Sequence, residues 1–457
     1  MFIDFLLDVF AQNAARTALI AANQSYTYQW LLDRISGRQQ FLRENGIAAG
    51  AIVVLRADYS PDSIATFLAL IEAGCVVIPV TTTAPAKFED ILQIGQAQWI
   101  ITVGENDASV TRHALNAEHP IYQEVRRRGH PGLVLFSSGS TGASKGTVHD
   151  LVHLLAKYRK RRHDLRTLAF LLFDHIGGLD TLFYSLSNGS ALVLVENRSP
   201  EAVCALIERH RVQVLPTAPT FLGMLVLTEA YRRHDLSSIK YVTYGAEMMP
   251  QATLDRCREI FPNATFLQKY GTTEVGTLRS KSREDGSLWV KIGGEGYQWR
   301  VVEGMLQIKA DSAMLGYLNA PSPFTADGWF MTGDCVEVDG EFIRILGRKN
   351  DIINVGGQKV YPAEVENVIR QMPAVADVTV CGQPNAMLGN IVVARVRLRD
   401  AMDPAAFRVA MKTHVAARLD AYKVPVKVEF TTESQSNERF KKIRRQDADA
   451  AQSENRS

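Results

Sequence analysis

The chain has 457 residues, of which 46% are hydrophobic and 22% are charged. This length fits a large α/β body with a smaller second unit, and the ordinary charged fraction excludes a disordered chain. The formal net charge of +2 argues against a protein that coats nucleic acid or an anionic membrane.

The first residues of the chain and the spacing of its cysteines are both consistent with a cytoplasmic protein. Residues 1–8 carry two acids and no basic region, so we expect an amphipathic helix that docks on the body and not a signal peptide. The five cysteines include no CxxC pair and no zinc spacing, which fits a reducing compartment. No apolar run approaches the roughly 20 residues that span a bilayer. We therefore predict a cytoplasmic location without stable membrane insertion.

Short apolar runs alternate with helical patterns in the first 200 residues. The predicted strands are 51–55, 75–80, 99–103, 132–136 and 191–195. A helix is expected at 63–72, between the strands at 51–55 and 75–80. Apolar strands that alternate with helices are typical of a parallel sheet covered on both faces. Ligands of such sheets bind at the carboxyl ends of the strands.

Beyond about residue 285 the pattern changes. Residues 289–345 combine short strands with glycine turns, as in a small β-rich unit, and the polar residues 347–351 predict a linker. A compact α+β unit follows. Its expected elements are a helix at 362–372, strands at 375–381 and 391–398, and a helix at 405–419. The predicted fold class is α/β, with parallel-sheet subdomains and a β-rich subdomain in a large N-terminal domain and a small α+β domain after it.

A loop rich in glycine and hydroxyls follows the strand at 132–136. It reads Ser137, Ser138, Gly139, Ser140, Thr141, Gly142, Ala143, Ser144, Lys145, Gly146. Glycines let backbone N–H groups approach phosphate oxygens, hydroxyls add donors and the lysine adds charge. A surface turn is the alternative, but a strand directly in front favours an anion site. A Walker A loop is excluded because only two residues separate Gly139 from Gly142.

This loop resembles the signature of the adenylate-forming superfamily, with Ser144 in place of the usual proline. That superfamily comprises acyl- and aryl-CoA synthetases, peptide-synthetase adenylation domains and firefly luciferase. Further stretches resemble its other motifs in the right order, at 244–247, 270–274, 332–334, 347–351 and 356–366. The resemblance extends over nearly the whole chain.

The resemblance implies that a carboxylic acid reacts with ATP to give an acyl-adenylate, which a thiol then attacks. It implies that Lys145 and the loop residues 137–142 hold the β- and γ-phosphates, that Thr273 donates to the α-phosphate and that Glu274 binds Mg²⁺. Asp334 would accept from the ribose hydroxyls, assisted by Arg348. Gly245, Ala246 and Glu247 are expected in the adenine-binding turn, and Tyr270, Gly271 and Thr272, from the next motif, are also expected to bind the nucleotide.

A second lysine is expected near the C-terminus. Setting Ile443 on the family isoleucine makes Lys442 the adenylation lysine, with Lys441 as the alternative one position away. A solvated basic tail is the competing interpretation. The resemblance divides the chain into an N-terminal AMP-binding domain, 1–349, and a mobile C-terminal domain, 350–457. Asn350 stands where the family usually has Asp or Lys.

Residues 173–178 carry two alternatives for the acid pocket. His175 resembles the histidine that acyl- and aryl-CoA ligases place near the carboxylate, whereas Phe173-Asp174 resembles the ammonium partner of amino-acid-activating domains. We favour His175 and a substrate without an amino group. Gly177 and Gly178 suggest room for an aryl or medium acyl group. The pocket is expected to draw on residues 217–221, 244–247 and 268–272.

The sequence thus predicts an AMP-forming acid–thiol ligase that uses ATP, Mg²⁺ and CoA. The alternative acceptor is the phosphopantetheine of a separate carrier protein, loaded with an acyl, aryl or amino acid. A third hypothesis, from another class, is a non-catalytic nucleotide-binding relative. Retention of Lys145, Glu274, Asp334 and Lys442 argues against it.

Overall fold

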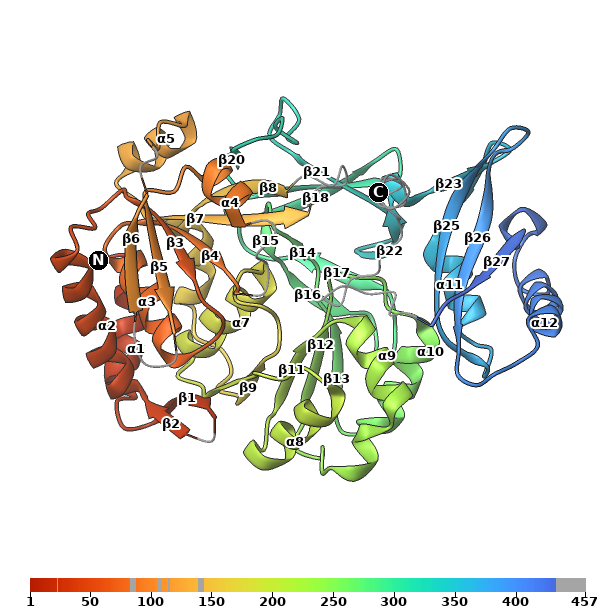
Figure 1. Ribbon diagram of the computed structural model, residues 1–457, viewed down its shortest axis with the longest axis horizontal. Helices are drawn as coiled ribbons and strands as arrows, with labels where there is room; N and C mark the ends of the chain where they lie inside the picture. Colours follow the sequence, from red (N-terminus) through yellow and green to blue (C-terminus); the bar gives the residue numbers. More distant parts are fainter. Residues whose placement is uncertain (23, 83–87, 105–107, 114–115, 139–143, 433–457) are drawn as a thin grey trace, which may run out of the picture.

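The computed structural model describes residues 1–432, apart from 23, 83–87, 105–107, 114–115 and 139–143. Two large sheets and a β-rich subdomain form the N-terminal body, and a smaller unit, blue in Figure 1, follows at one end. None of the helices in this described part is both long and apolar enough to cross a membrane. The predicted fold class is confirmed.

The first seven-stranded sheet carries the glycine-rich loop. Its strands, in spatial order, are β20 (Gly316–Tyr317), β8 (Ser144–Asp150), β7 (Gly132–Ser138), β4 (Val76–Val80), β3 (Ile52–Arg56), β5 (Trp99–Val103) and β6 (Ala108–Arg112). The four predicted strands, β3, β4, β5 and β7, are confirmed and parallel. The expectation of a purely parallel sheet is wrong at its edges, where β6 and β8 are antiparallel. The loops before these two strands are too short for a crossover, so the chain must reverse.

The second seven-stranded sheet is parallel from its first strand to β1. Its order is β13 (Thr265–Gln268), β12 (Tyr241–Tyr244), β11 (Val214–Thr217), β9 (Thr167–Ala169), β10 (Leu192–Leu194), β1 (Thr17–Ala21) and β2 (Gln24–Thr27). Thr217 pairs with Tyr244, and Tyr244 with Gln268, so three carboxyl ends share one edge. The helices that flank this sheet include α7 (Ile176–Ser187), α8 (Pro200–His210), α9 (Pro219–Thr228) and α10 (Gln251–Ile260).

One hydrophobic core joins the two large sheets. It contains Val53 and Leu133 from the first sheet, Leu192 from the second, and Leu179 from α7, all essentially without solvent exposure. The predicted N-terminal helix is confirmed as α1 (Asp4–Gln12), which buries its apolar face in the same core. The helices α2 (Tyr28–Glu44) and α3 (Pro61–Glu72) lie beside α1 in this part of the molecule. The shared core fixes the relative positions of the loops at the sheet edges.

The predicted β-rich unit is confirmed as a six-stranded sheet. Its order is β16 (Arg279–Ser282), β17 (Val290–Gly293), β22 (Phe342–Arg348), β21 (Phe330–Asp339), β19 (Met305–Ala310) and β18 (Tyr297–Val302). The predicted linker at 347–351 is wrong for its first two residues, because Gly347 and Arg348 extend β22 and pair with Cys335 and Asp334. A hairpin of β14 (Gly271–Thr272) and β15 (Gly276–Thr277) lies beside it.

A short 3₁₀ turn, η4 (Lys349–Asp351), leads into the C-terminal unit. The elements that follow are β23 (Ile353–Val355), β24 (Gln358–Val360), α11 (Pro362–Ile369), β25 (Val375–Asn385), β26 (Gly389–Leu398), α12 (Pro404–Ala416) and β27 (Lys427–Phe430). They enclose a hydrophobic core of their own, whose buried members run from Ile353 to Val428. The predicted helices and strands of this unit are confirmed.

Candidate active site

The strands on either side of the glycine-rich loop form a hairpin. Ser137 pairs with Lys145 and Ser138 with Ser144 across β7 and β8. Gly139, Ser140, Thr141 and Gly142, which are predicted phosphate-binding residues, lie outside the described residues. The hairpin therefore positions Lys145 at the base of this loop.

Tyr317 connects Lys145 to Glu274. Its ring centroid lies 5.3 Å from Lys145 Nζ, and its hydroxyl donates a hydrogen bond of 2.7 Å to Glu274 Oε1. Burial, reinforced by the negative charge of Glu274, raises the pKa of Tyr317, so the hydroxyl remains a donor. A cation suited to phosphate and a carboxylate suited to a metal ion are thereby brought to one place.

Tyr317 and Asn319 are not among the residues predicted from the sequence. Both lie at or just beyond β20, which pairs with β8. Asn319 Oδ1 accepts from the backbone N–H of Gly146 at 3.1 Å, and its side-chain amide donates to the carbonyl of Ser144 at 2.8 Å. Because 173 residues separate Gly146 from Asn319, no spacing rule connects them in the sequence.

A buried histidine, also missed from the sequence, supports the segment of Thr273 and Glu274. His149 Nε2 lies 2.6 Å from the carbonyl oxygen of Thr273, and the side chain has no solvent exposure. Burial lowers the pKa of His149, so the ring is neutral and donates from Nε2. On the other side, the backbone N–H of Met314 donates to the Glu274 carbonyl at 2.7 Å. Two contacts therefore fix the backbone that presents both predicted catalytic residues.

The predicted adenine-binding turn follows β12 directly. Ala246 has a left-handed φ of 67°, and a Cβ on Gly245 would lie 2.6 Å from the carbonyl oxygen of Lys269. Only glycine permits this close approach of the turn to the next strand end. Thr220 donates to Glu247 Oε2 from its hydroxyl at 2.6 Å and from its backbone N–H at 3.2 Å. The turn is thus held rigidly at the carboxyl edge of the second sheet.

Buried polar oxygens at the same edge lack partners within the described part of the chain. They are Thr217 Oγ1, Gln268 Oε1 and Thr272 Oγ1. Thr217 and Gln268 end β11 and β13, and Thr272 lies four residues beyond Gln268. Since buried polar atoms in proteins are nearly always hydrogen-bonded, the atoms of Thr217 and Gln268 at this edge and of Thr272 in β14 are available to a polar ligand.

The predicted ribose-binding aspartate lies in a buried polar cluster. Tyr270 donates to Asp334 Oδ2 at 2.6 Å, and Arg348 Nε lies 3.2 Å from Oδ1. Burial raises the pKa of Asp334 above its usual range, although Arg348 and the Tyr270 hydrogen bond act in the opposite direction. The cluster brings together Tyr270, Asp334 and Arg348, as expected for one site.

Asp174 and His175 lie in the segment between β9 and α7. Neither lies at a strand end, because β9 stops at Ala169. His175 caps α7, with Nδ1 accepting from the backbone N–H of Gly177 at 3.0 Å, whereas Asp174 is buried, with Oδ2 3.4 Å from the hydroxyl of Thr81. The structure therefore places His175 at the start of a helix and Asp174 in the interior.

The expected space at Gly177 and Gly178 is also absent. A Cβ on Gly178 would lie 1.9 Å from the carbonyl oxygen of Leu172, and one on Gly177 would lie 2.8 Å from Leu171 Cδ1. These glycines let α7 begin against the preceding loop, so the protein's own chain fills the space. They carry no information about the size of the acid.

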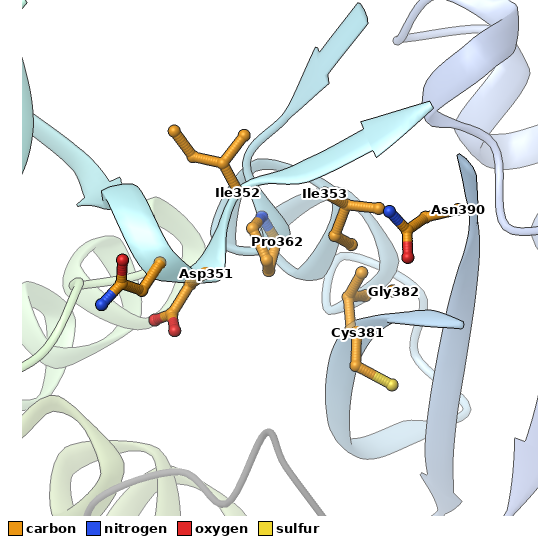
Figure 2. A pocket seen from close by; sticks show the side chains of 9 residues that line it. Asp351, Ile352, Ile353, Pro362, Cys381, Gly382 and Asn390 are labelled. Atoms are coloured by element: carbon orange, nitrogen blue, oxygen red, sulfur yellow. The ribbon is translucent and has the colours of Figure 1, made fainter. Parts of the chain in front are cut away.

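A pocket of about 240 Å³ lies at the junction with the C-terminal unit (Figure 2). It is lined by residues 350–353, Pro362, residues 380–382 and Asn390. Of the predicted nucleotide-binding residues that the structure describes, none lines it. Lys441 and Lys442, the alternatives for the second lysine, lie outside the described residues.

Comparisons with known proteins show the family to which the chain is related. The profile of the AMP-binding enzyme family matches residues 7–304, and that of the AMP-binding enzyme C-terminal domain matches residues 364–441. The chain is 28% identical to the 3-[(3aS,4S,7aS)-7a-methyl-1,5-dioxo-octahydro-1H-inden-4-yl]propanoyl:CoA ligase of Mycobacterium tuberculosis, over 91% of this chain and 92% of that protein. It is 30% identical to the 2-succinylbenzoate–CoA ligase of Bacillus subtilis, over 70% and 69% of the two chains.

The fold is similar to that of an anthranilate CoA ligase crystallised with anthranoyl-AMP. The TM-score is 0.81 at 22% sequence identity, with 96% of this chain and 95% of that chain covered. The predicted resemblance to adenylate-forming enzymes is confirmed. The chain belongs to the AMP-binding enzyme family.

Proposed function

We propose that this enzyme uses ATP to convert a carboxylic acid into an acyl-adenylate and then transfers the acyl group to CoA. The observation that carries the proposal is the contact chain from Lys145 through Tyr317 to Glu274. It brings a cation and a carboxylate to the loop where a triphosphate is expected. The similarity to CoA ligases over most of the chain supports CoA as the acceptor.

The first half-reaction must bring an anionic acid to an anionic triphosphate. In our proposal Lys145 and the loop residues 137–142 bind the β- and γ-phosphates, and Thr273 donates to the α-phosphate. Glu274 is suited to Mg²⁺, because a hard cation prefers carboxylate oxygen and the Tyr317 hydrogen bond keeps Glu274 Oε1 in place. Mg²⁺ bound there with ATP would supply charge neutralisation.

The nucleoside would lie along the carboxyl edge of the second sheet. Gly245, Ala246 and Glu247 form one wall for the adenine, and Tyr270, Gly271 and Thr272 form the other. Asp334 would accept from the ribose hydroxyls, with Arg348 assisting. A carboxylate oxygen has two lone pairs, so Asp334 can keep its bond to Tyr270 and still accept from a ribose. The unpartnered oxygens of Thr217, Gln268 and Thr272 support a polar ligand at this edge.

The second half-reaction requires a different arrangement of the C-terminal unit. We propose a boundary between 1–349 and 350–457, with rotation about η4, where the described hydrophobic cores of the two parts are separate. All the residues that line the pocket in Figure 2 belong to 350–457, and Asn350 and Asp351 of η4 are among them, so the pocket lies beside the proposed pivot. Lys442 would act in adenylation by bridging the acid and the α-phosphate, with Lys441 as the alternative.

For the acid, we retain His175 as the group nearest the carboxylate and a substrate without an amino group. Asp174 is already engaged by Thr81 in the interior, which argues against it as an ammonium partner. We place the enzyme in the cytoplasm, consistent with five free cysteines. These cysteine thiols would be maintained in a reducing compartment.

The test is a panel of carboxylic acids, each offered with ATP, Mg²⁺ and CoA, with and without an α-amino group. We expect acid-dependent pyrophosphate release and an acyl-CoA identified by its mass, both lost in Lys145→Ala. Transfer only to a phosphopantetheinylated carrier protein would contradict CoA as acceptor. Preference for the amino acid, abolished by Asp174→Ala, would overturn the choice of His175. ATP binding without pyrophosphate release from any acid would indicate a non-catalytic relative.

A further inference from the structure

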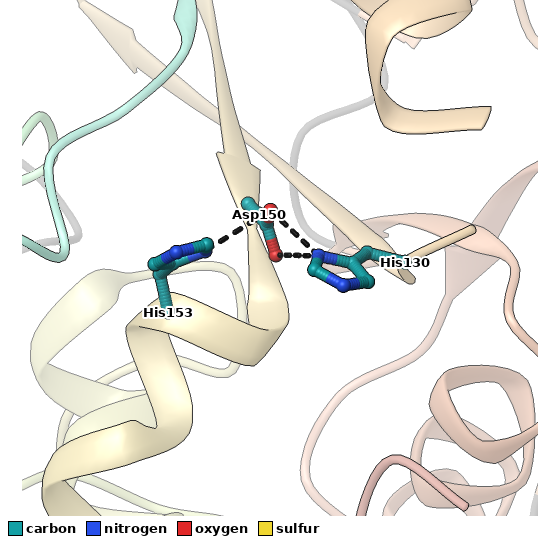
Figure 3. Close-up of side chains that lie close together, drawn as sticks. All are labelled: His130, Asp150 and His153. Carbon is teal, nitrogen blue, oxygen red and sulfur yellow. Dashed lines mark hydrogen bonds and ion pairs between the residues drawn. The ribbon is translucent and has the colours of Figure 1, made fainter. Parts of the chain in front are cut away.

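Two histidines and an aspartate converge at the end of the β7–β8 hairpin that lies away from the glycine-rich loop (Figure 3). His130 Nδ1 lies 2.9 Å from Asp150 Oδ2, and His153 Nδ1 lies 3.1 Å from the same oxygen. One ligand atom from each of the three side chains lies within 4.8 Å of the others. Two imidazole nitrogens and a carboxylate are a donor set that first-row divalent metal ions prefer.

The backbone holds these three side chains in a fixed relation. Asp150 is the last residue of β8 and pairs with Gly132, which lies two residues after His130. The backbone N–H of Leu151 donates to the carbonyl of Pro131. Asp150 also caps α6 (Leu151–Leu155), since its Oδ1 accepts from the backbone N–H of Val152 at 3.0 Å. His153 lies three residues after the cap, on the same face of the helix. The site thus needs no ordering of a loop before it can bind.

The nearest competing charge is Arg128. Its Nη1 lies 3.0 Å from Asp150 Oδ2, where a metal ion would also bind. Its Nε, however, donates to Glu124 Oε1 at 2.8 Å, so Arg128 can release Asp150 and keep an anionic partner. Glu124 is paired with Arg127 as well. Displacement of Arg128 therefore leaves no charge in this cluster without a partner.

We propose that His130, Asp150 and His153 bind a divalent first-row transition-metal ion of the Zn²⁺ type. Ligand distances of about 2.0–2.2 Å put tetrahedral ligands roughly 3.4 Å apart, so the two nitrogens need to open from Asp150 by only a few tenths of an ångström. Each imidazole would carry its proton on Nε2 and coordinate through Nδ1. His153 is exposed, so water completes the coordination shell.

This site is distinct from the proposed nucleotide site. The pair Ser138–Ser144, beside the glycine-rich loop, and the pair Gly132–Asp150, beside the metal site, are six residues apart along the hairpin. At roughly 3.3 Å per residue this separates the two sites by about 20 Å. The ion would join the start of β7, the end of β8 and the first turn of α6. We expect the ion to stabilise the first sheet without taking part in the reaction. This metal site does not depend on the proposed function.

The experiment uses the full, untagged chain freed of metal by chelation. Calorimetric titration with Zn²⁺ should give one equivalent with a Kd of about 10 µM or tighter. Co²⁺ should give a visible absorption band with nitrogen–oxygen character, and Zn²⁺ should raise the midpoint of thermal unfolding. His130→Asn and His153→Asn should each weaken Zn²⁺ binding more than about 100-fold, since even outer-shell losses cost roughly 10–100-fold. Asp150 is left unchanged because it also caps α6.

Two further variants sharpen the test. Arg128→Gln removes the competing cation, so Zn²⁺ should bind several-fold more tightly, whereas a purely structural ion-pair cluster would lose stability and gain no affinity. His163→Asn changes an exposed histidine outside the cluster and should leave binding unchanged. The proposal is overturned by absence of saturable binding, by equal binding in wild type and His153→Asn, or by equal loss in His163→Asn.

Discussion

Replacing Tyr317 with Phe isolates one contact of the proposed active site. The change removes the hydroxyl that donates to Glu274 Oε1 at 2.7 Å, and it keeps the ring that lies 5.3 Å from Lys145 Nζ. The carbon framework is unchanged, so the packing of β20 against β8 should persist. If Glu274 binds Mg²⁺, the variant should impair the adenylation step specifically.

The magnitude follows from the charge of the acceptor. A hydrogen bond to a charged group contributes about 1.5–3 kcal/mol. If all of this free energy acts on the placement of Glu274 in the transition state, kcat/KM for MgATP should fall by roughly 10- to 160-fold. The KM for the acid should change little, because within the described residues the side-chain contacts of Tyr317 are with Glu274 and Lys145 and not with His175.

The assay is acid-dependent pyrophosphate release at saturating acid with MgATP varied. Tyr317→Leu is the matched variant, since it also removes the ring beside Lys145 and should lose roughly a further 0.5–2 kcal/mol of phosphate binding. Thermal unfolding of both variants controls for misfolding. A Tyr317→Phe enzyme within twofold of wild type would refute the reasoning, as would an equal rise in the KM values of ATP and acid.

Three other outcomes are expected. Asp334→Asn keeps the size of the side chain but removes its charge, so ATP affinity should fall by roughly 1.5–3 kcal/mol, measured by calorimetry, while acid affinity is unchanged; equal losses would indicate a structural role. Lys442→Ala should lower adenylation by about 10²–10³-fold and spare thioester formation from supplied acyl-adenylate, and the same loss in Lys441→Ala instead would shift the register by one. Burial lowers the pKa of His149 below its ordinary value of 6.5, so as the pH falls the unfolded chain binds a proton at this residue before the folded chain does. The free energy of unfolding should therefore fall as the pH drops below 6.5. His149→Gln should reduce this pH dependence, measured by denaturant unfolding at a series of pH values.

Local chemistry in the sequence was sufficient to predict much of this protein. The strand at 99–103 matches β5 to the residue, because a run of five aromatic and β-branched residues is too short for a typical helix and favours a buried strand. The glycine-rich loop was found because glycines, hydroxyls and a lysine directly after a predicted strand suit an anion. The stretches Gly245-Ala246-Glu247 and Tyr270-Gly271-Thr272 were located by their resemblance to motifs of the adenylate-forming superfamily.

The tertiary structure alone decided which distant residues meet. Tyr317 reaches Glu274 and Lys145 because β20 adds to the edge of the first sheet, and His149 reaches Thr273 because the two large sheets share a core. The tight packing at Gly178 has a similar origin, since its close approach to the carbonyl of Leu172 depends on how α7 enters that core. Such contacts are set by the packing of whole layers, and no local preference of these residues specifies their partners.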